Sequence, residues 1–339
     1  MKRIKLSLVI LIAGLFITKT DFAQNSSEPY EIVKSITLPG DAKWDFCNID
    51  QPTHRLYISR KNKVQVVDLV SETLIGEIDH TTAGVHGIAI ASDLNRGFIS
   101  NGDSSTVSVF DLKTLKIITV VKLKGKSPDA IVYDLSTHRI FAFCAKSNDV
   151  SVIDGNTNTI IGSVAFNGNP EFGVTNNKGK IYNNVEDKSE LVCFNANTLK
   201  VESTWKLTPC EGPTGLAIDI KNNRLFTGCR GNKGLSVINA SNGNAIQTLP
   251  IGSSVDAVAY DPSTHLIFSS NGDGTLTIIQ QDDPDHYKVI QNLITKKGSK
   301  TLAYDLSTHK VYLCSADFTP DKKIVTGSFK VLVAAQKNK

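Results

Sequence analysis

The sequence lacks the short motifs by which several large enzyme classes are recognised. It contains no G-x-S-x-G nucleophile elbow, no G-x-G-x-x-G turn, no Walker phosphate loop and no H-E-x-x-H zinc helix. A serine hydrolase, a dehydrogenase or a nucleotide hydrolase would have to work without its usual motif. Long helical periodicity is also missing after residue 24. The chain is therefore expected to consist of strands and loops.

Charge of one sign is scarce once the N-terminus is set aside. Residues 1–24 hold four basic residues and one acidic residue, which account for +3 of the net charge of +4. The remaining chain has only short basic pairs, such as Lys296-Lys297 and Lys322-Lys323. A near-neutral surface gives no electrostatic indication of nucleic-acid binding, and none is expected.

The N-terminus has the pattern of a secretory signal peptide. Lys2, Arg3 and Lys5 precede an apolar run at 6–17, and a more polar stretch with small residues follows to residue 24. A run of twelve residues is short for a membrane span, although an uncleaved anchor is the alternative. We therefore predict a signal peptide at 1–24, an exported protein in the periplasm or outside the cell, and no integral membrane span.

An internal repeat predicts the fold. Related segments begin 41 to 44 residues apart along the chain. They are DFCNID (45–50), HGIAIA (86–91), DAIVYD (129–134), EFGVTN (171–176), TGLAID (214–219), DAVAYD (256–261) and KTLAYD (300–305). Each is followed by an aromatic-bearing strand, a third strand and, in most repeats, a fourth, rich in Val, Ile, Tyr, Phe and Thr. Four antiparallel strands per repeat predict an all-β, seven-bladed β-propeller that occupies residues 25–339 as one domain.

The last repeat is one strand short, and the N-terminal segment 30–38 can supply that strand. Pairing 30–38 with 329–335 would close the ring and cover two sheet edges that otherwise invite aggregation. We expect a monomer.

The repeat resembles a known family. The segment NDVSVIDGNTNTIIGSVAF (148–166), with RLYIS and FISN nearby, is similar to the YVTN-type propeller repeat and to the YncE-like family of exported propellers. The match covers nearly all of residues 30–335. It implies the propeller scaffold, and relatives with this fold include surface propellers that bind ligands. Lactonases with similar seven-bladed rings place His, Glu and Arg around the channel mouth, and His86, Glu171 and Arg230 are the candidates here.

The turn between the first two strands carries a repeated histidine, which we interpret as part of the scaffold. His54, His138, His265 and His309 all occupy this position, and arginines follow several of these turns. Asp, Ser and Thr in such turns can cap the backbone locally. These arginines are expected to be solvated and to lie on the face opposite the functional site.

The first strand of each blade should line the central channel, so its first residue should lie at one mouth. That position reads Asp45, His86, Asp129, Glu171, Thr214, Asp256 and Lys300. Carboxylates packed there should have raised pKa values or should bind a cation. Asp45, Asp129, Glu171 and Asp256 are the predicted metal ligands. Oxygen ligands alone would suit calcium or magnesium, and His86 would admit zinc or manganese.

Further residues are expected near this mouth. The long insert 315–328 of the last blade could form a lid, and Trp44 could form an aromatic lip or pack between the first and last blades. None of the six cysteines forms a C-x-x-C pair, so most are expected to be buried as small apolar residues. Cys193, Cys210 and Cys229 should lie at the same end of neighbouring blades, where a disulfide between two of them is possible.

Three functions remain open from the sequence. The leading interpretation is a binding protein that captures a small molecule or a cell-envelope partner at the acidic mouth. The alternative is a metal-assisted hydrolase or lyase, for example a lactonase, with His86 as general base. The third is a protein–protein scaffold in which the channel plays no part.

Overall fold

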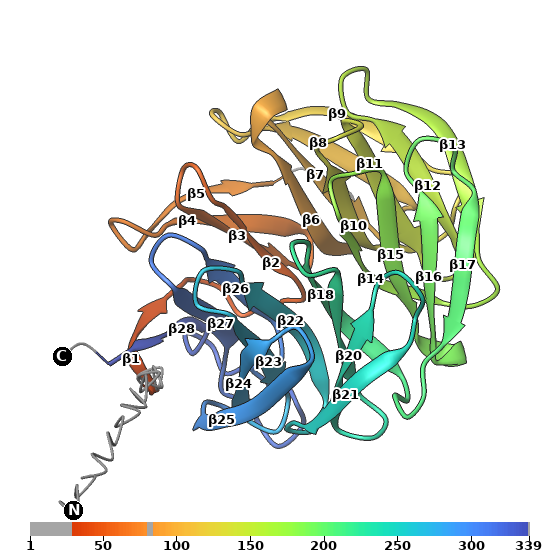
Figure 1. Cartoon of the computed structure of the whole chain (residues 1–339). Coiled ribbons are helices and arrows are strands. Elements are labelled where there is room, and N and C mark those ends of the chain that lie inside the picture. The colour runs from red at the N-terminus through yellow and green to blue at the C-terminus, as the bar shows by residue number, and fades with distance from the viewer. Residues whose placement is uncertain (1–28, 80–83, 338–339) are drawn as a thin grey trace, which may run out of the picture.

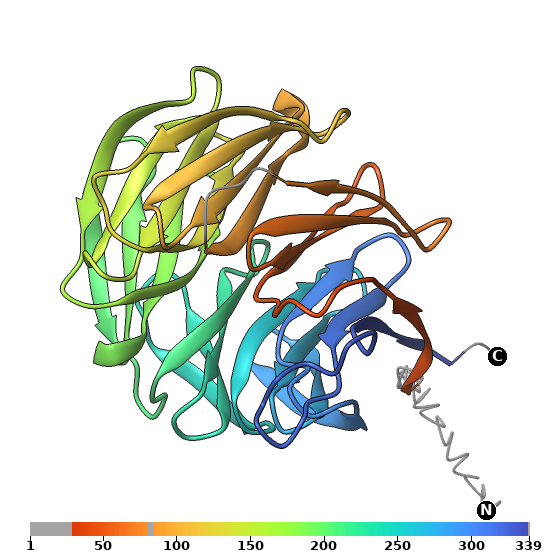
Figure 2. The same ribbon diagram turned by 180° about the vertical axis from the view of Figure 1, so that it is seen from behind.

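The chain folds into a ring of seven four-stranded antiparallel sheets around a central channel (Figure 1, Figure 2). This computed structural model describes residues 29–79 and 84–337. The predicted signal peptide at 1–24 lies outside the described residues. The fold confirms the predicted seven-bladed β-propeller.

Within each blade the strands follow one another from the channel to the rim. The first three blades contain β2 (Cys47–Asp50), β3 (Arg55–Arg60), β4 (Lys63–Asp68) and β5 (Thr73–Ile78); β6 (Val85–Ala91), β7 (Arg96–Asn101), β8 (Thr106–Asp111) and β9 (Ile117–Lys122); and β10 (Pro128–Asp134), β11 (Arg139–Cys144), β12 (Asp149–Asp154) and β13 (Thr159–Ala165). Two short 3-10 helices, Ser92–Leu94 and Glu186–Lys188, occupy loops.

The remaining blades repeat this order. They contain β14 (Pro170–Thr175), β15 (Lys180–Val185), β16 (Glu190–Asn195) and β17 (Val201–Lys206); β18 (Pro213–Asp219), β19 (Arg224–Cys229), β20 (Gly234–Asn239) and β21 (Ala245–Pro250); β22 (Val255–Asp261), β23 (Leu266–Asn271), β24 (Thr275–Asp283) and β25 (His286–Ile294); and, in blade seven, β26 (Leu302–Asp305), β27 (Lys310–Ser315), β28 (Lys330–Gln336) and β1 (Tyr30–Thr37).

The core lies between the blades rather than in the channel. Seven clusters of buried apolar side chains are present in the described residues, and the cluster that joins Phe98 of blade two to Ile140 of blade three is one of them. Middle strands such as β11 have neighbours on both faces and are almost wholly buried, whereas the outer strand β13 is largely exposed. This burial explains why the middle strands read as continuous apolar runs.

The ring closes as predicted, because β1 pairs antiparallel with β28, from Tyr30 with Gln336 to Thr37 with Lys330. Arg60 reinforces this closure from blade one. Its side chain is 1% exposed, lies 3.5 Å from the centre of the Phe329 ring, and donates hydrogen bonds to the carbonyl oxygens of Gly40 and Ala42. The segment between β1 and β2 is thereby tied to blade seven.

The turns opposite the mouth are structural, as the repeat predicted. The four turn histidines all have positive φ angles between 51° and 57°. The expectation that the arginines after these turns are solvated is wrong. Arg55, Arg96 and Arg139 each donate to main-chain carbonyl groups of the next blade, for example from Arg139 Nη1 to Ala196 O at 2.6 Å. The arginines therefore link neighbouring blades.

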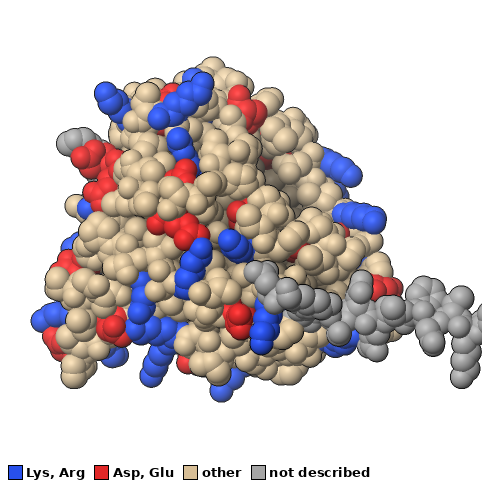
Figure 3. Space-filling view, turned by 90° about the vertical axis from the view of Figure 1, so that its left-hand side faces the viewer, with Lys and Arg blue, Asp and Glu red and all other residues tan. Residues whose placement is uncertain are grey.

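The cysteines follow the predicted pattern. A disulfide joins Cys210 to Cys229, while Cys144, Cys193 and Cys314 are buried free thiols and Cys47 is half-buried. In the side view of Figure 3, basic and acidic side chains are interspersed over the visible face. Within the described part of the chain, no helix is long and apolar enough to cross a membrane.

Candidate functional site

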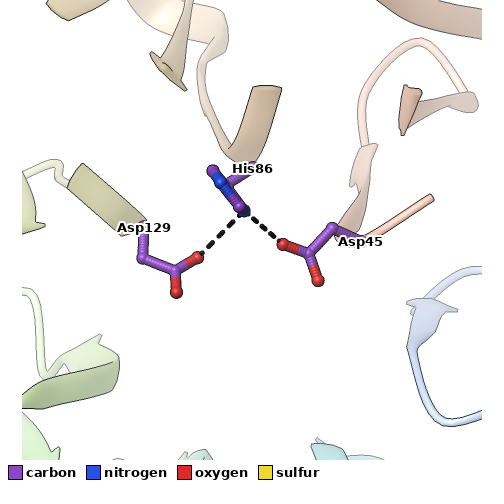
Figure 4. Close-up of side chains that lie close together, drawn as sticks. All are labelled: Asp45, His86 and Asp129. Atoms are coloured by element: carbon purple, nitrogen blue, oxygen red, sulfur yellow. Dashed lines mark hydrogen bonds and ion pairs between the residues drawn. The ribbon is translucent and has the colours of Figure 1, made fainter. Parts of the chain in front are cut away.

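Three of the predicted mouth residues meet at one point of the channel. His86 lies between the carboxylates of Asp45 and Asp129, and all three side chains point toward one another (Figure 4). His86 Nδ1 donates to Asp45 Oδ2 at 2.5 Å and lies 3.5 Å from Asp129 Oδ1. One possible ligand atom from each residue lies within 4.8 Å of the others. We call this set the Asp-His-Asp cluster.

Irregularities in the pairing of the strands determine the direction in which these side chains point. The strand register shifts at the mouth end of the first strand in blades two to six, between Val85 and Ile88 in blade two and between Pro128 and Ile131 in blade three. Bulges of this kind re-aim a side chain at the end of a strand. His86 and Asp129 are located within these shifts, so the scaffold itself turns them toward the channel.

An aromatic pair forms a floor beneath the mouth. The rings of Phe46 and Phe172 stack with centres 4.8 Å apart. Because these residues belong to blades one and four, which are not neighbours, the two rings meet across the channel. They directly follow Asp45 and Glu171 in the sequence. The polar mouth is thus backed by apolar rings, which lowers the solvation of the charges above them.

The electrostatics of the cluster reflect this setting. The hydrogen bond from His86 to Asp45 raises the pKa of His86, although burial opposes this, and the charge of Asp129 adds to the increase. Burial, together with the charge of Asp45, raises the pKa of Asp129 to about 6. Asp129 Oδ1 is buried and accepts no hydrogen bond. The cluster therefore has an acceptor atom whose bonding capacity the described residues do not use.

Glu171 lies near Asp129, and its surroundings favour the protonated form of the Glu171 carboxyl group. Burial raises the pKa of Glu171 to about 9, and the nearby charges of Asp129 and Glu186 act in the same direction. Glu171 also shares a hydrogen bond with Glu186. Near neutral pH Glu171 therefore holds a proton beside the Asp-His-Asp cluster.

The other side of the mouth is neutralised by ion pairs. Arg230 contacts Glu186 at 2.9 Å and also pairs with Asp256, which in turn lies 2.8 Å from Lys300 Nζ. Asp256 thus has two cationic partners. Of the four predicted metal ligands, the structure brings Asp45 and Asp129 together around His86, with Glu171 nearby, while Asp256 belongs to this separate ion-pair network.

Two further predicted residues, Thr214 and Trp44, also differ in whether they reach the mouth surface. Thr214 is fully buried and its hydroxyl donates to the carbonyl oxygen of Val255 at 3.0 Å, so it contributes to the wall rather than to the mouth surface. Trp44 is half-buried against Phe318 and Phe329 of blade seven. It also lines a pocket of about 1230 Å³ that contains Asp45 and His86 and is bounded by residues 319–326. Trp44 therefore packs against blade seven and lines this pocket.

Sequence reasoning did not identify the Phe46–Phe172 floor or the ion pairs that remove Asp256 from the acidic set. A signal for the floor was present, because an acidic residue is followed by Phe at both 45–46 and 171–172. No sequence signal indicated which carboxylates would find cationic partners. That depends on side chains from loops of different blades.

Comparison with known proteins gives the fold and no family. No family model matches the chain, and no curated protein matches it. A solved structure of Kuenenia stuttgartiensis hydrazine synthase matches with a TM-score of 0.71 and 14% identity over 88% of this chain and 98% of that chain. U3-55K matches with a TM-score of 0.76 and 8% identity over 88% and 97% of the two chains. A chain of a mitotic checkpoint complex matches with a TM-score of 0.76 and 13% identity over 98% and 100%. At these identities the likeness shows the propeller fold alone.

Proposed function

We propose that this protein is a ligand-binding propeller whose channel mouth holds a divalent metal ion on Asp45, His86 and Asp129. The observation that carries the proposal is the convergence of one imidazole nitrogen and two carboxylate oxygens within 4.8 Å. Asp129 Oδ1 supports it, because this buried atom accepts no hydrogen bond and lies 3.5 Å from His86 Nδ1, where a cation bound between the two would contact both.

The donor set favours zinc or manganese over calcium or magnesium. Calcium and magnesium prefer oxygen ligands alone, whereas imidazole with carboxylate suits zinc and manganese. Three protein ligands also leave coordination positions open, and an external ligand can occupy them. The adjoining pocket of about 1230 Å³ has the size of a small-molecule site. A metal-bound small molecule is therefore the proposed cargo.

A metal-assisted hydrolase or lyase is the second candidate, and Glu171 is the feature that favours it. Glu171, with its raised pKa, holds a proton beside the cluster, where it could protonate a leaving group. In that reaction the metal would polarise a carbonyl group or activate water, and Arg230 would stabilise negative charge. A lactone panel separates the two candidates, because only the enzyme turns lactones over.

The proposal extends to location and partners. The signal-peptide pattern of residues 1–24 supports export to the periplasm or the cell exterior, and the repeat at 148–166 supports kinship with YncE-like propellers. A cell-envelope protein is then a plausible recipient of the cargo. If the chain is instead a scaffold, substitutions at the mouth should leave partner binding unchanged.

Metal titration tests the proposal directly. Zinc or manganese should raise the melting temperature of the protein, since a ligand at one hundred times its dissociation constant adds about 2.7 kcal/mol. His86→Asn and Asp129→Asn should each remove this response. His138→Asn is the matched control, because His138 also lies beside a carboxylate, 3.1 Å from Asp93, but on the opposite face. An equal metal response in the wild-type protein and in both mouth variants would refute the assignment.

A further inference from the structure

Two lysine pairs that are far apart in the sequence come together beside the long loop of blade seven. Lys296-Lys297 follows the last strand of blade six, and Lys322-Lys323 lies within the 315–328 insert. Lys296, Lys297 and Lys322 line one pocket of about 590 Å³, and Lys43, from the segment between β1 and β2, completes it. We call this the lysine pocket.

The charge of the lysine pocket is largely unbalanced. Asp317 is the acidic residue among its lining side chains, and its carboxylate pairs with Lys296. Among the described residues, Lys43, Lys297 and Lys322 are in no ion pair. Three ammonium groups held around one concavity repel one another, and a bound anion would relieve that repulsion. The pocket therefore has the electrostatics of an anion site.

One wall of the pocket is aromatic. Phe318 is 43% exposed, so part of its apolar ring is available to a ligand in the pocket. Its ring is backed by Trp44 at 6.0 Å, and a β-bridge between Phe318 and Ile324 holds its loop. Gly298 has φ of +88°, and a Cβ atom there would lie 3.3 Å from the Phe318 ring. Glycine at this position thus allows both the turn and the close approach of the ring.

We infer that the lysine pocket binds a small organic dianion, with an apolar body against Phe318 and a phosphate ester or paired carboxylates against Lys43, Lys297 and Lys322. The volume fits a ligand of this size. The site is separate from the Asp-His-Asp cluster, although Lys43 and Lys322 also line the larger pocket above Asp45 and His86. It stands whether or not the mouth binds a metal.

Calorimetric titration of the full chain in chelator tests this inference, with inorganic phosphate, phenyl phosphate and benzene-1,2-dicarboxylate as probes. Phenyl phosphate should bind about tenfold more tightly than inorganic phosphate, and its binding should weaken as salt is added. Comparison of the ester with the dicarboxylate distinguishes the two anion classes. In Phe318→Ala the advantage of phenyl phosphate over inorganic phosphate should disappear.

Lysine variants supply the decisive comparison. The double variant Lys43→Ala/Lys297→Ala should bind phenyl phosphate about tenfold more weakly, and Lys43→Arg/Lys297→Arg should retain binding. Lys113→Ala/Lys178→Ala removes two exposed lysines elsewhere and should behave as wild type. Unchanged affinity in the first variant would overturn the inference. His86→Asn should lose the metal response yet keep phenyl phosphate binding, so the two proposals can fail separately.

Discussion

The two faces of the ring both carry histidines beside aspartates, but the surroundings of these pairs differ. On the turn face, His309 Nδ1 lies 2.9 Å from Asp261 Oδ2. At the mouth, His86 Nδ1 lies 2.5 Å from Asp45 Oδ2. The pairs look alike in geometry, so the distance between the two side chains does not distinguish scaffold from site. The distinction lies in what else the carboxylates contact.

Carboxylates on the turn face follow a hydrogen-bonding pattern that recurs in five of the seven blades. An aspartate at the end of the first strand is buried, accepts hydrogen bonds from its own turn, and is contacted by a side chain of the next blade. The contacts between blades are Asp50 with Ser92, Asp134 with Thr175, Asp219 with Tyr260, Asp261 with Tyr304, and Asp305 with His54. This recurrence identifies them as clasps that hold neighbouring blades together.

The mouth does not recur, and its carboxylates are not satisfied in this way. The equivalent position changes from blade to blade through Asp, His, Glu, Thr and Lys. A buried oxygen without a hydrogen bond occurs on both faces, at Asp129 Oδ1 and at Asp305 Oδ2. The two faces differ in the direction of the pKa shift: although burial opposes this, hydrogen bonds from its own turn lower the pKa of Asp305, whereas burial raises the pKa of Asp129 to about 6 and that of Glu171 to about 9. Repetition of a residue type does not by itself mark the scaffold, because Asp45, Asp129 and Asp256 share one residue type at the mouth. A group whose charged form is disfavoured by its surroundings is the candidate for function.

The largest expected effect on stability comes from removing one of the aspartates that link neighbouring blades. Asp261→Ala should destabilise the protein by about 3 kcal/mol, because it leaves buried donors without an acceptor. Asp261 accepts from the hydroxyl of Tyr304 at 2.7 Å and from Ser263 and Thr264 of its own turn. The denaturant midpoint measures the loss. Asp283→Ala, at an exposed site of the same blade, should change stability by less than about 0.5 kcal/mol.

The contribution of Asp261 should also appear in the pH dependence of stability at acidic pH. Although burial opposes it, hydrogen bonds from Thr264 and Tyr304 lower the pKa of Asp261 to about 2. A depressed pKa contributes stability that is present above the unfolded value of 3.8 and is lost as the pH falls toward 2. Asp261→Ala should therefore flatten the acid unfolding curve in this window. If the stability of the variant fell with pH as steeply as that of the wild-type protein, Asp261 would not be the source of this loss of stability.

Much of the scaffold could be predicted from the sequence, because it depends on repetition. The seven segments from DFCNID to KTLAYD indicated the number of blades, and the missing strand of the last repeat indicated the pairing of 30–38 with 329–335. The mouth position of His86 and Asp129 followed from the same alignment. The number of blades and the mouth positions follow from the periodicity of the strands, and the pairing of the two terminal segments follows from the closure of the ring.

The division of the mouth into two sides could not be predicted, because it depends on long side chains that reach between blades. Asp256 is paired with Arg230 and Lys300, whereas Asp129 is not paired with a lysine or arginine. Both aspartates begin a first strand, so their sequence contexts are alike. The lysine pocket was hidden for a related reason, since Lys297 and Lys322 come from loops of two neighbouring blades and Lys43 joins them only in the closed ring.

A smaller effect of opposite sign is expected at the mouth. Since the pKa of Glu171 is raised from 4.5 to about 9, its contribution to stability is complete below pH 4.5 and is lost as the pH rises toward 9. In chelator, Glu171→Gln should therefore stabilise the protein at pH 8 and have little effect at pH 4. Thermal unfolding at both values measures this difference.

A matched control is available for that prediction on the surface of the same blade. The pKa of Glu202 is lowered, by a hydrogen bond from Asn195 and by Lys180, so Glu202→Gln should not stabilise the protein at pH 8. If Glu171→Gln destabilised the protein at pH 8, Glu171 would belong with the clasps rather than with the site, and the distinction between the two faces would fail.

The smallest effect compares one histidine from each face by the same substitution. His309 has φ of 57°, a conformation that asparagine tolerates, so His309→Asn should lose only its contacts with Asp261 and Tyr304. Its cost should be about 0.5 kcal/mol, with the metal response intact. His86→Asn should leave stability in chelator within about 0.5 kcal/mol of wild type but remove the metal response. Because each variant changes one property and spares the other, the pair tests whether the repeated histidine is scaffold and the unrepeated one is a ligand. The reverse pattern, with the metal response lost in His309→Asn and kept in His86→Asn, would move the cation site to the turn face.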